Sequence, residues 1–258
     1  MAQHDYNIAN ATAPNFRTDL NNNLSAIVSQ NSGTSAPSNT FANMMWYDTT
    51  NNILKMRNEA DSSWINLFTL DQSANTSNPS SDKVGMEFIE SQDASTSATL
   101  DFTGFDSTRY DAYVFVMSNL VASTEGSTDF HVLTSTDGGS TYDSGASAYA
   151  YVKRELELEA VPTDAFEGSA GSTFIQVAGN LGAVANESFS GELKVFGPHL
   201  TAHTRLMWTG VFNTRAKLVE VRGSASRLSA ADVDAIQFLF NAGNISSGTI
   251  TMYGLRNS

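Results

Sequence analysis

From about Val84 to its end, the chain alternates apolar and polar residues with a period of two, between clusters of turn-forming residues. Successive side chains of a β-strand point to opposite faces, so this period predicts half-buried strands. The absence of amphipathic helices between them favours an antiparallel β-sandwich, jelly-roll-like, over an alternating βα fold. The expected strands are 85–90, 98–102, 112–117, 130–134, 148–154, 173–177, 192–196, 205–211, 218–222, 235–240 and 248–253. Residues 228–234 fit either one helical turn capped by Ser229 or a loop.

The N-terminal part of the chain predicts one short helix, at about 14–30. Pro14 suits the first turn of a helix, where its missing N–H costs nothing, and Gly33 closes the segment. Asparagine is a poor helix former, so the run Asn21 to Asn23 makes this helix too weak to stand alone. It packs either on its own domain or on another chain through a narrow apolar stripe. The stripe consists of Phe16, Leu20, Leu24, Ile27 and Val28.

A small β-module follows at about 44–68, where the sequence MMWYDTTNNILKMRNEADSSWINL alternates strand-forming and turn-forming residues. Trp46 and Trp64 are either the core of this module or a platform for a sugar. Residues 71–83 are polar, contain Pro79 and lack apolar periodicity, which predicts a linker. The expected organisation is therefore an N-terminal module over 1–70, a linker over 71–83 and a β-sandwich domain over 84–258.

Composition excludes several classes of function. The chain of 258 residues has 14 Lys and Arg against 27 Asp and Glu, a net charge of −13, whereas nucleic-acid binding needs clustered cations. There is no cysteine, so disulfides and thiolate chemistry are absent. The N-terminus has neither the basic nor the apolar region of a signal peptide, and no apolar run is long enough to span a membrane. We therefore expect no nucleic-acid partner and no membrane insertion.

Catalytic and metal-binding patterns are weak. His199 and His203 have helical metal-site spacing, but Pro198 precedes them and a strand follows, so no metal site is predicted. The sequence has no Gly-x-Ser-x-Gly turn for a serine nucleophile. Glu155, Glu157 and Glu159 alternate along one predicted strand, which indicates a solvated acidic edge with Leu156 and Leu158 opposite. We expect no cofactor and no enzymatic activity.

The string STDGGSTY, from Ser135 to Tyr142, resembles the Asp-box hairpin motif, Ser-x-Asp-x-Gly-x-Thr-aromatic. In such a turn Asp137 accepts backbone N–H groups, Gly139 adopts a positive φ and Tyr142 packs beneath. The motif occurs once, so it indicates a fold feature and not a propeller repeat. A calcium ion near Asp137 and Asp143 stays an open alternative.

Three stretches carry a resemblance to a known group of proteins. They are the opening MAQHDYNIANATAPNFRTDLNNNLSAIVSQNSG, the module MMWYDTTNNILKMRNEADSSWINL and the closing GTITMYGLRNS. Together they resemble tail-fibre-like virion structural proteins of tailed bacteriophages and prophages. YDAYVFVMSNL and the following LTSTDGGSTYDSGASAYAY resemble the jelly-roll domain that many of these proteins carry. The long repetitive shaft of such fibres is missing here, which favours a short fibre, a knob or a decoration protein.

The resemblance implies a non-enzymatic virion protein, made in the host cytoplasm and released by lysis. It implies a homotrimer whose N-terminal module attaches to other virion proteins and whose β domain faces outward. One hypothesis is host attachment through a surface glycan or protein, with Tyr142, Tyr149 and Tyr151 as receptor-facing aromatics. The other is a capsid decoration, head-fibre, tail or baseplate component without a receptor. A depolymerase is the third class, and it lacks a positioned acid/base pair.

Overall fold

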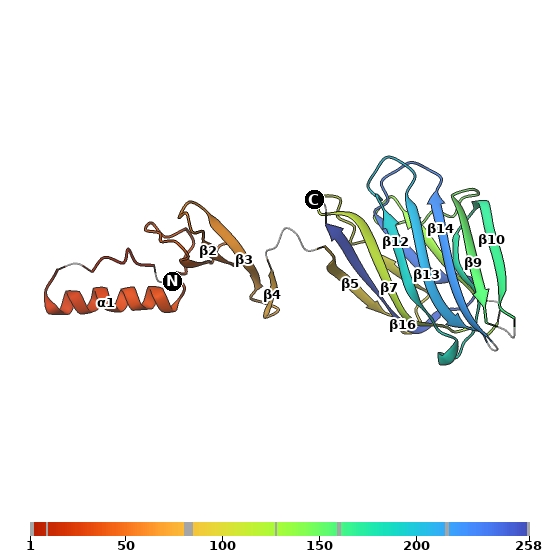
Figure 1. Ribbon diagram of the computed structural model, residues 1–258, viewed down its shortest axis with the longest axis horizontal. Helices are drawn as coiled ribbons and strands as arrows, with labels where there is room; N and C mark the ends of the chain where they lie inside the picture. The colour runs from red at the N-terminus through yellow and green to blue at the C-terminus, as the bar shows by residue number, and fades with distance from the viewer. Residues whose placement is uncertain are drawn as a thin grey trace. The chain divides into compact units, whose positions relative to one another are not determined.

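The computed structural model describes residues 3–8, 10–79, 85–126, 128–158, 161–214 and 217–256. It divides the chain into two compact units, Met1–Lys83 and Val84–Ser258 (Figure 1). The first unit holds the only helix of the described residues that is longer than one turn, and most strands belong to the second. The chain is mainly β, as the sequence predicts.

The first unit contains one helix and one four-stranded antiparallel sheet. The helix α1 spans Ala13–Val28, and the strands follow the chain order across the sheet. The helix begins with Pro14 in its first turn, as expected, but it ends before residue 30. Gln30 and Asn31 have φ values of +54° and +53°, which a helix cannot continue. The strands are β1 (Met45–Asp48), β2 (Ile53–Arg57), β3 (Trp64–Asp71) and β4 (Thr76–Pro79).

The expected linker over 71–83 is wrong in its first part, because this part forms a hairpin. The Asp71 Oδ1 atom accepts the backbone N–H of Ser73 and of Ala74, both at 2.9 Å. Asn75 adopts a φ of +55°, and β4 then pairs with β3. Asp, Ser and Asn build this turn through their short polar side chains, which a reading of hydrophobic periodicity does not detect. Residues 80–83 of the expected linker lie outside the described residues.

The second unit is a sandwich of two antiparallel sheets. The larger sheet has the strand order β10-β9-β14-β13-β12-β7-β16-β5, and the smaller has the order β11-β8-β15-β6. The bounds are β5 (Glu87–Asp93), β6 (Thr99–Phe102), β7 (Tyr110–Ala122), β8 (Thr128–Ser135), β9 (Tyr149–Glu157), β10 (Thr163–Ser172), β11 (Ile175–Leu181), β12 (Phe189–Phe196), β13 (Arg205–Asn213), β14 (Leu218–Arg227), β15 (Ala235–Phe240) and β16 (Ile245–Arg256), with one short 3₁₀ turn at Ala185–Glu187.

The topology is that of a jelly roll with two hairpin insertions, which confirms the expected fold class. Strands β5, β16, β7 and β12 face β6, β15, β8 and β11, and the chain passes from one sheet to the other at most steps. The pair β9–β10 is inserted after β8, and the pair β13–β14 after β12. Both insertions join the larger sheet, where β14 pairs with β9 (Figure 1). The insertions therefore double the width of one sheet.

Aromatic side chains fill the space between the sheets. The rings of Phe102, Phe115 and Phe238 lie within 6 Å of one another and are fully buried. Phe130 stacks on Phe238 at a ring-centroid distance of 6.0 Å. Edge-to-face and offset contacts of this kind add to the free energy of burial. This cluster holds the two four-stranded parts of the jelly roll together.

The sequence did not predict β10, and the structure shows why. Almost every side chain of this edge strand is exposed, so Thr163–Ser172 has no apolar alternation. Cross-strand contacts hold it instead: Arg154 on β9 donates two hydrogen bonds to the Asp164 carboxylate, at 2.8 and 2.9 Å. Gly168 packs so closely that an added Cβ would lie 2.6 Å from the Tyr151 carbonyl oxygen. Residues 228–234, the other open segment, form a loop and not a helical turn.

Candidate functional site

The apolar stripe predicted on the N-terminal helix is exposed in the single chain. The exposed fractions of Phe16, Leu20, Leu24, Ile27 and Val28 are 45%, 36%, 51%, 52% and 82%. The helix also lacks a side-chain N-cap, acidic residues in its first turn and basic residues in its last turn. Its stripe is thus available for a partner, and nothing at its ends makes up for the poor helix propensity of its asparagines.

An N-terminal arm lies beside α1. The Nε2 atom of His4 lies 2.8 Å from the Asp19 carboxylate, and its Nδ1 atom accepts the Tyr6 backbone N–H at 3.0 Å. The Tyr6 hydroxyl bonds to the side chain of Asn31, just past the end of the helix. Asn31 in turn donates to the Met45 carbonyl oxygen at 2.9 Å. Polar contacts therefore join arm, helix and first strand, while the stripe stays uncovered.

The two tryptophans of the β-module form a core, which favours the first of the two interpretations. Trp46 is 5% exposed, and its ring meets Trp64 edge to face at 5.2 Å. The Lys55 ammonium lies 4.6 Å from the Trp46 ring, and the Arg57 guanidinium lies 5.4 Å from the Trp64 ring. Such cation–π contacts cover both rings. Neither indole presents an open platform for a sugar.

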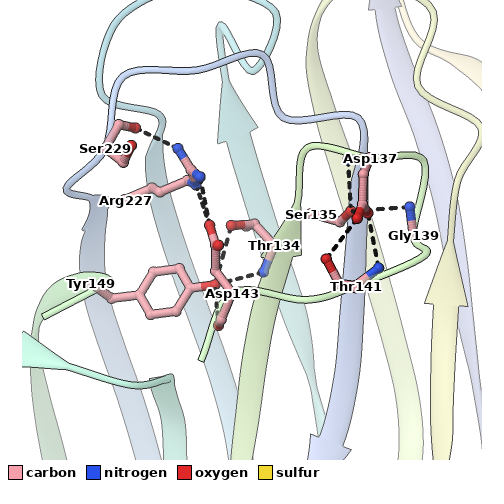
Figure 2. Close-up of polar contacts among 9 residues, drawn as sticks. All are labelled: Thr134, Ser135, Asp137, Gly139, Thr141, Asp143, Tyr149, Arg227 and Ser229. Atoms are coloured by element: carbon pink, nitrogen blue, oxygen red, sulfur yellow. Dashed lines mark hydrogen bonds and ion pairs between the residues drawn. The ribbon is translucent and has the colours of Figure 1, made fainter. Parts of the chain in front are cut away.

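The Asp-box turn has the geometry that its sequence predicts (Figure 2). Asp137 accepts the Thr141 hydroxyl at 2.6 Å and the Thr141 backbone N–H at 2.9 Å, and the Ser135 hydroxyl donates to it at 2.7 Å. These hydrogen bonds hold the pKa of Asp137 at about 2. Gly139 has a φ of +81°. The carboxylate is thus fully used in closing its own turn.

A second polar network anchors the other end of the same loop, and Figure 2 shows the two side by side. The guanidinium of Arg227 meets the Asp143 carboxylate at 2.6 and 2.7 Å and donates to the Ser229 carbonyl oxygen at 2.6 Å. The Tyr149 hydroxyl donates to the Asp143 carbonyl oxygen at 3.0 Å and accepts the Thr134 backbone N–H at 2.8 Å. Asp137 faces hydroxyl and N–H donors and Asp143 faces a guanidinium, so neither carboxylate suits a calcium ion.

The receptor-facing aromatics predicted from sequence do not form an exposed cluster. Tyr149 is completely buried, so this prediction is wrong for it. The Tyr142 hydroxyl is enclosed without a hydrogen-bond partner, and burial raises the pKa of this side chain to about 12. The Tyr151 hydroxyl donates to the Gln176 side chain at 3.1 Å. The period-two pattern places Tyr149 and Tyr151 on a strand correctly, and Tyr142 lies in the loop before it. This pattern cannot tell which face of the strand the fold covers.

The prediction of a solvated acidic edge is wrong for Glu155, while Leu156 and Glu157 are both half-buried. Glu155 is 8% exposed and Leu158 is 59% exposed, so the carboxylate points inward and the leucine outward. The Lys153 ammonium lies 2.6 Å from Glu155 and 2.7 Å from Glu167. Burial lowers the pKa of Lys153, but these two carboxylates outweigh burial and raise it. Glu159 lies outside the described residues.

The buried ion pair closes the edge of the smaller sheet. Glu155 accepts the backbone N–H of Gly179 on β11 at 3.2 Å, and the Trp208 indole donates to the Val177 carbonyl oxygen at 2.9 Å. Strand β11 is the edge of its sheet, where unpaired backbone groups need partners. The inserted strands β9 and β13 supply them. This cluster was missed because its partners are far apart in sequence, and its role is structural.

The outer face of the larger sheet carries an open hollow of about 530 Å³. Its walls are Val152 on β9 and Met207 on β13, which are 54% and 56% exposed. Ser224 and Ser226 on β14 form the floor, and Arg205 closes one end. Small side chains between two taller rows produce this shape. No sequence pattern singled out this surface.

The histidines do not come together. His199 lies 3.8 Å from Asp111, His203 is exposed, and His131 is buried against the ring of Phe174 at 3.8 Å. Across the described ranges, no group of three or more His, Asp or Glu side chains is placed to hold a metal ion. In the same ranges, no helix has both the length and the apolar character that crossing a membrane requires. Comparison with protein-family models, curated proteins and solved structures found no significant match.

Proposed function

We propose that this chain is a non-enzymatic structural protein of a tailed-bacteriophage particle, a short trimeric tail fibre. Its N-terminal unit docks on other virion proteins, and its jelly roll faces outward toward the host surface. The assignment to a virion rests on the sequence resemblance. The physical support for a docking role comes from the first unit.

The observation that carries the proposal is that the first unit has only a very small apolar core, around its two tryptophans. Among its described residues, Ala26, Pro37 and Trp46 are the only buried apolar side chains, whereas Phe16, Leu24 and Ile27 are about half exposed. A unit of this size depends on buried apolar area to offset the conformational entropy lost on folding. Burial against another chain supplies that area.

The way in which the charged residues are used supports a structural role for the second unit. Asp137 closes a turn, Arg227 and Asp143 anchor a loop, and Lys153 with Glu155 caps a sheet edge. Each of these groups already has partners of opposite charge or hydrogen-bond donors. None of them is left to act on a substrate.

The test of the docking role is incorporation into particles. We expect phage that encode the protein without residues 1–35 to assemble particles that lack it, while the purified variant keeps the circular dichroism of its β domain. A matched control is Asn22→Asp, an exposed change within the same segment that leaves the stripe intact. Normal incorporation of the deleted protein would remove the attachment role from this segment.

A second candidate function, host binding, is supported by the hollow on the outer face of the larger sheet. Apolar walls, hydroxyls and one guanidinium suit a glycan or a protein surface. We expect the full protein to bind susceptible host cells and Met207→Glu to weaken this binding. Val184→Glu, an equally exposed site away from the hollow, is the control. If the protein binds no susceptible host, host binding is refuted. The protein is then a capsid decoration or a tail component without a receptor.

A further inference from the structure

The hollow on the outer face of the larger sheet is built from two neighbouring rungs of three strands. In chain register these rungs are Ala150, Ser226 and Arg205, and then Val152, Ser224 and Met207. Neighbouring strands lie about 4.8 Å apart, and successive side chains on one face of a strand lie about 7 Å apart. The floor of two serines therefore measures roughly 10 by 7 Å between its walls. That footprint has the size of one six-membered sugar ring.

The strands beneath the hollow do not favour a peptide or a protein as its occupant. Strand β14 pairs with β13 and β9, and these two pair in turn with β12 and β10. A peptide that joins a sheet as a new strand needs the free backbone groups of an edge, which these strands do not offer. A stable protein interface covers about 800 Å² per partner, far more than this floor. The hollow therefore suits a small ring that is recognised by side chains.

Arg205, at one end of the hollow, has neutral partners only. Its Nη1 atom donates to the His203 carbonyl oxygen at 2.7 Å and to the Ser226 hydroxyl at 2.8 Å. Within the described parts of the chain, no carboxylate lies within ion-pair distance of this guanidinium, and its Nε and Nη2 atoms have no hydrogen-bond acceptor. The two neutral acceptors thus fix the orientation of the side chain and leave its charge and two donors available to a ligand.

The other cations that line this hollow and the two beside it each have an acidic partner on the same sheet. The pairs are Arg154 with Asp164, Lys194 with Glu192, and Arg222 with Glu220. Arg154 holds its carboxylate through two hydrogen bonds, at 2.8 and 2.9 Å. Such bidentate pairs are among the strongest that a guanidinium makes. Arg205 is the same kind of side chain, on the same sheet, without its acid.

We propose that the hollow binds a sugar that carries a carboxylate. The acid group pairs with the Nε and Nη2 atoms of Arg205, and the ring lies on the serine floor between Val152 and Met207. The exposed Ser224 hydroxyl is there to pair with a hydroxyl of the ring. The inference rests on the proposed host binding and names the chemical class of its ligand.

The charge of the whole chain does not decide this binding. The net charge of −13 repels anions in general, but at physiological ionic strength the field of an exposed charge is largely screened beyond about 8 Å. Around the hollow, the acids already have cations of their own, and the charge of Arg205 is the one without an acid. One ion pair and one ring make a small contact, so we expect a dissociation constant in the millimolar range.

The first experiment titrates the full chain with acidic sugars and follows the methyl NMR signal of Met207, which Met207→Leu identifies. The probes are glucuronate, galacturonate and N-acetylneuraminate, each paired with its uncharged methyl ester. We expect at least one acid to shift the Met207 signal, and its ester to bind at least roughly tenfold more weakly. The proposal is overturned if no acid shifts the signal, or if the esters bind as well as the acids.

The second experiment tests the role of Arg205. We expect Arg205→Gln to weaken binding of the acid at least roughly tenfold, and Arg205→Lys to weaken it less, because lysine keeps the charge but not the fork. Arg109→Gln, an exposed arginine away from the hollow, should bind like the wild type. Near-ultraviolet circular dichroism confirms that each variant is folded. Unchanged binding by Arg205→Gln would overturn the proposal, and so would tighter binding of glucose 6-phosphate than of glucuronate.

Further outcomes separate this inference from the proposed host binding. Host cells that bind the wild type, bind Met207→Glu less and bind Arg205→Gln equally well would keep the host-binding function and refute the acidic sugar. Acidic sugars that shift the Met207 signal of a protein that binds no susceptible host would keep the sugar site and refute host attachment through it.

Discussion

At the scale of single residues, the contact between Arg227 and Asp143 ties the loop after β8 to the end of β14. The Arg227 side chain is 6% exposed and that of Asp143 is 38% exposed, so solvent screens the pair only in part. We expect Arg227→Ala to lower the free energy of unfolding by about 1–3 kcal/mol, because it removes charge-assisted hydrogen bonds and leaves a carboxylate without its cation. Urea denaturation of the second unit measures this loss.

The matched control is Arg222→Ala, whose side chain is 70% exposed beside Glu220. Exposed ion pairs contribute little, so this change should stay within about 0.5 kcal/mol of the wild type. If both variants lose the same free energy, the loop does not depend on the Arg227 contact.

The burial of His131 leads to a prediction about how the stability of the protein depends on pH. Burial beside Phe174 lowers the pKa of His131 to about 4, whereas an unfolded histidine titrates near 6.5. Between these values the unfolded chain binds more protons than the folded chain, so the stability is complete above pH 6.5 and falls as the pH drops toward 4. We expect this loss to be roughly 2–3 kcal/mol, and His131→Phe to remove that part of the pH profile.

Other groups titrate in the same experiment, so the comparison is with His203→Gln. His203 is exposed and should leave the profile unchanged. Hydrogen bonds hold the pKa of Asp137 at about 2. Burial would raise the pKa of Asp48, but hydrogen bonds from Asn51 and Lys55 outweigh it and hold this pKa at about 2 as well. The stability that these two carboxylates provide is therefore lost only below about pH 4. An identical pH dependence in the wild type and His131→Phe would contradict the assignment.

The residues that sequence analysis placed correctly are those whose partners are local. Asp137 and Thr141 are four positions apart, and the sequence motif itself contains both partners of the hydrogen bond that joins them. Tyr149 and Glu155 were assigned to the wrong environment because their partners, Thr134 and Gly179, lie on other strands. Periodicity predicts that a side chain alternates, and only the tertiary fold decides which side is covered.

At the scale of elements, the same distinction explains which strands were found. The strand around Phe115 was predicted because its apolar residues face a core. Strand β10 is held by Arg154 and by backbone pairing, and β4 by a polar turn, so neither leaves an apolar signature. The jelly-roll order itself was predicted only as a class, since the sequence does not show which strands are insertions.

The prediction at the scale of elements concerns the exposed apolar stripe of helix α1. Leu20 is in the middle of the exposed stripe, and a carboxylate buried there without a partner is unfavourable. We expect Leu20→Asp to convert the proposed trimer to monomers in analytical ultracentrifugation, with the near-ultraviolet circular dichroism of the second unit unchanged. Asn22→Asp, on another side of the helix, should stay trimeric. A trimer that survives Leu20→Asp would place the interface away from the stripe.

At the scale of the whole molecule, the two units differ in how they obtain their stability. The second unit surrounds a continuous core that includes Phe102, Phe115, Phe130 and Phe238. The described part of the first unit buries only Ala26, Pro37 and Trp46 among its apolar side chains. If the proposed association occurs, the folding of the first unit is coupled to it, whereas the jelly roll folds around its own core.

This difference predicts two unfolding transitions with different dependence on concentration. A fragment of residues 85–258 should unfold cooperatively at a temperature that does not change with its concentration. In the full chain, an additional transition should move upward as the concentration rises, because association stabilises the folded state by mass action. Differential scanning calorimetry over a hundredfold range of concentration measures both. If the full chain shows a single transition that is independent of concentration, the first unit is stable by itself, and its exposed helix stripe needs no partner for folding.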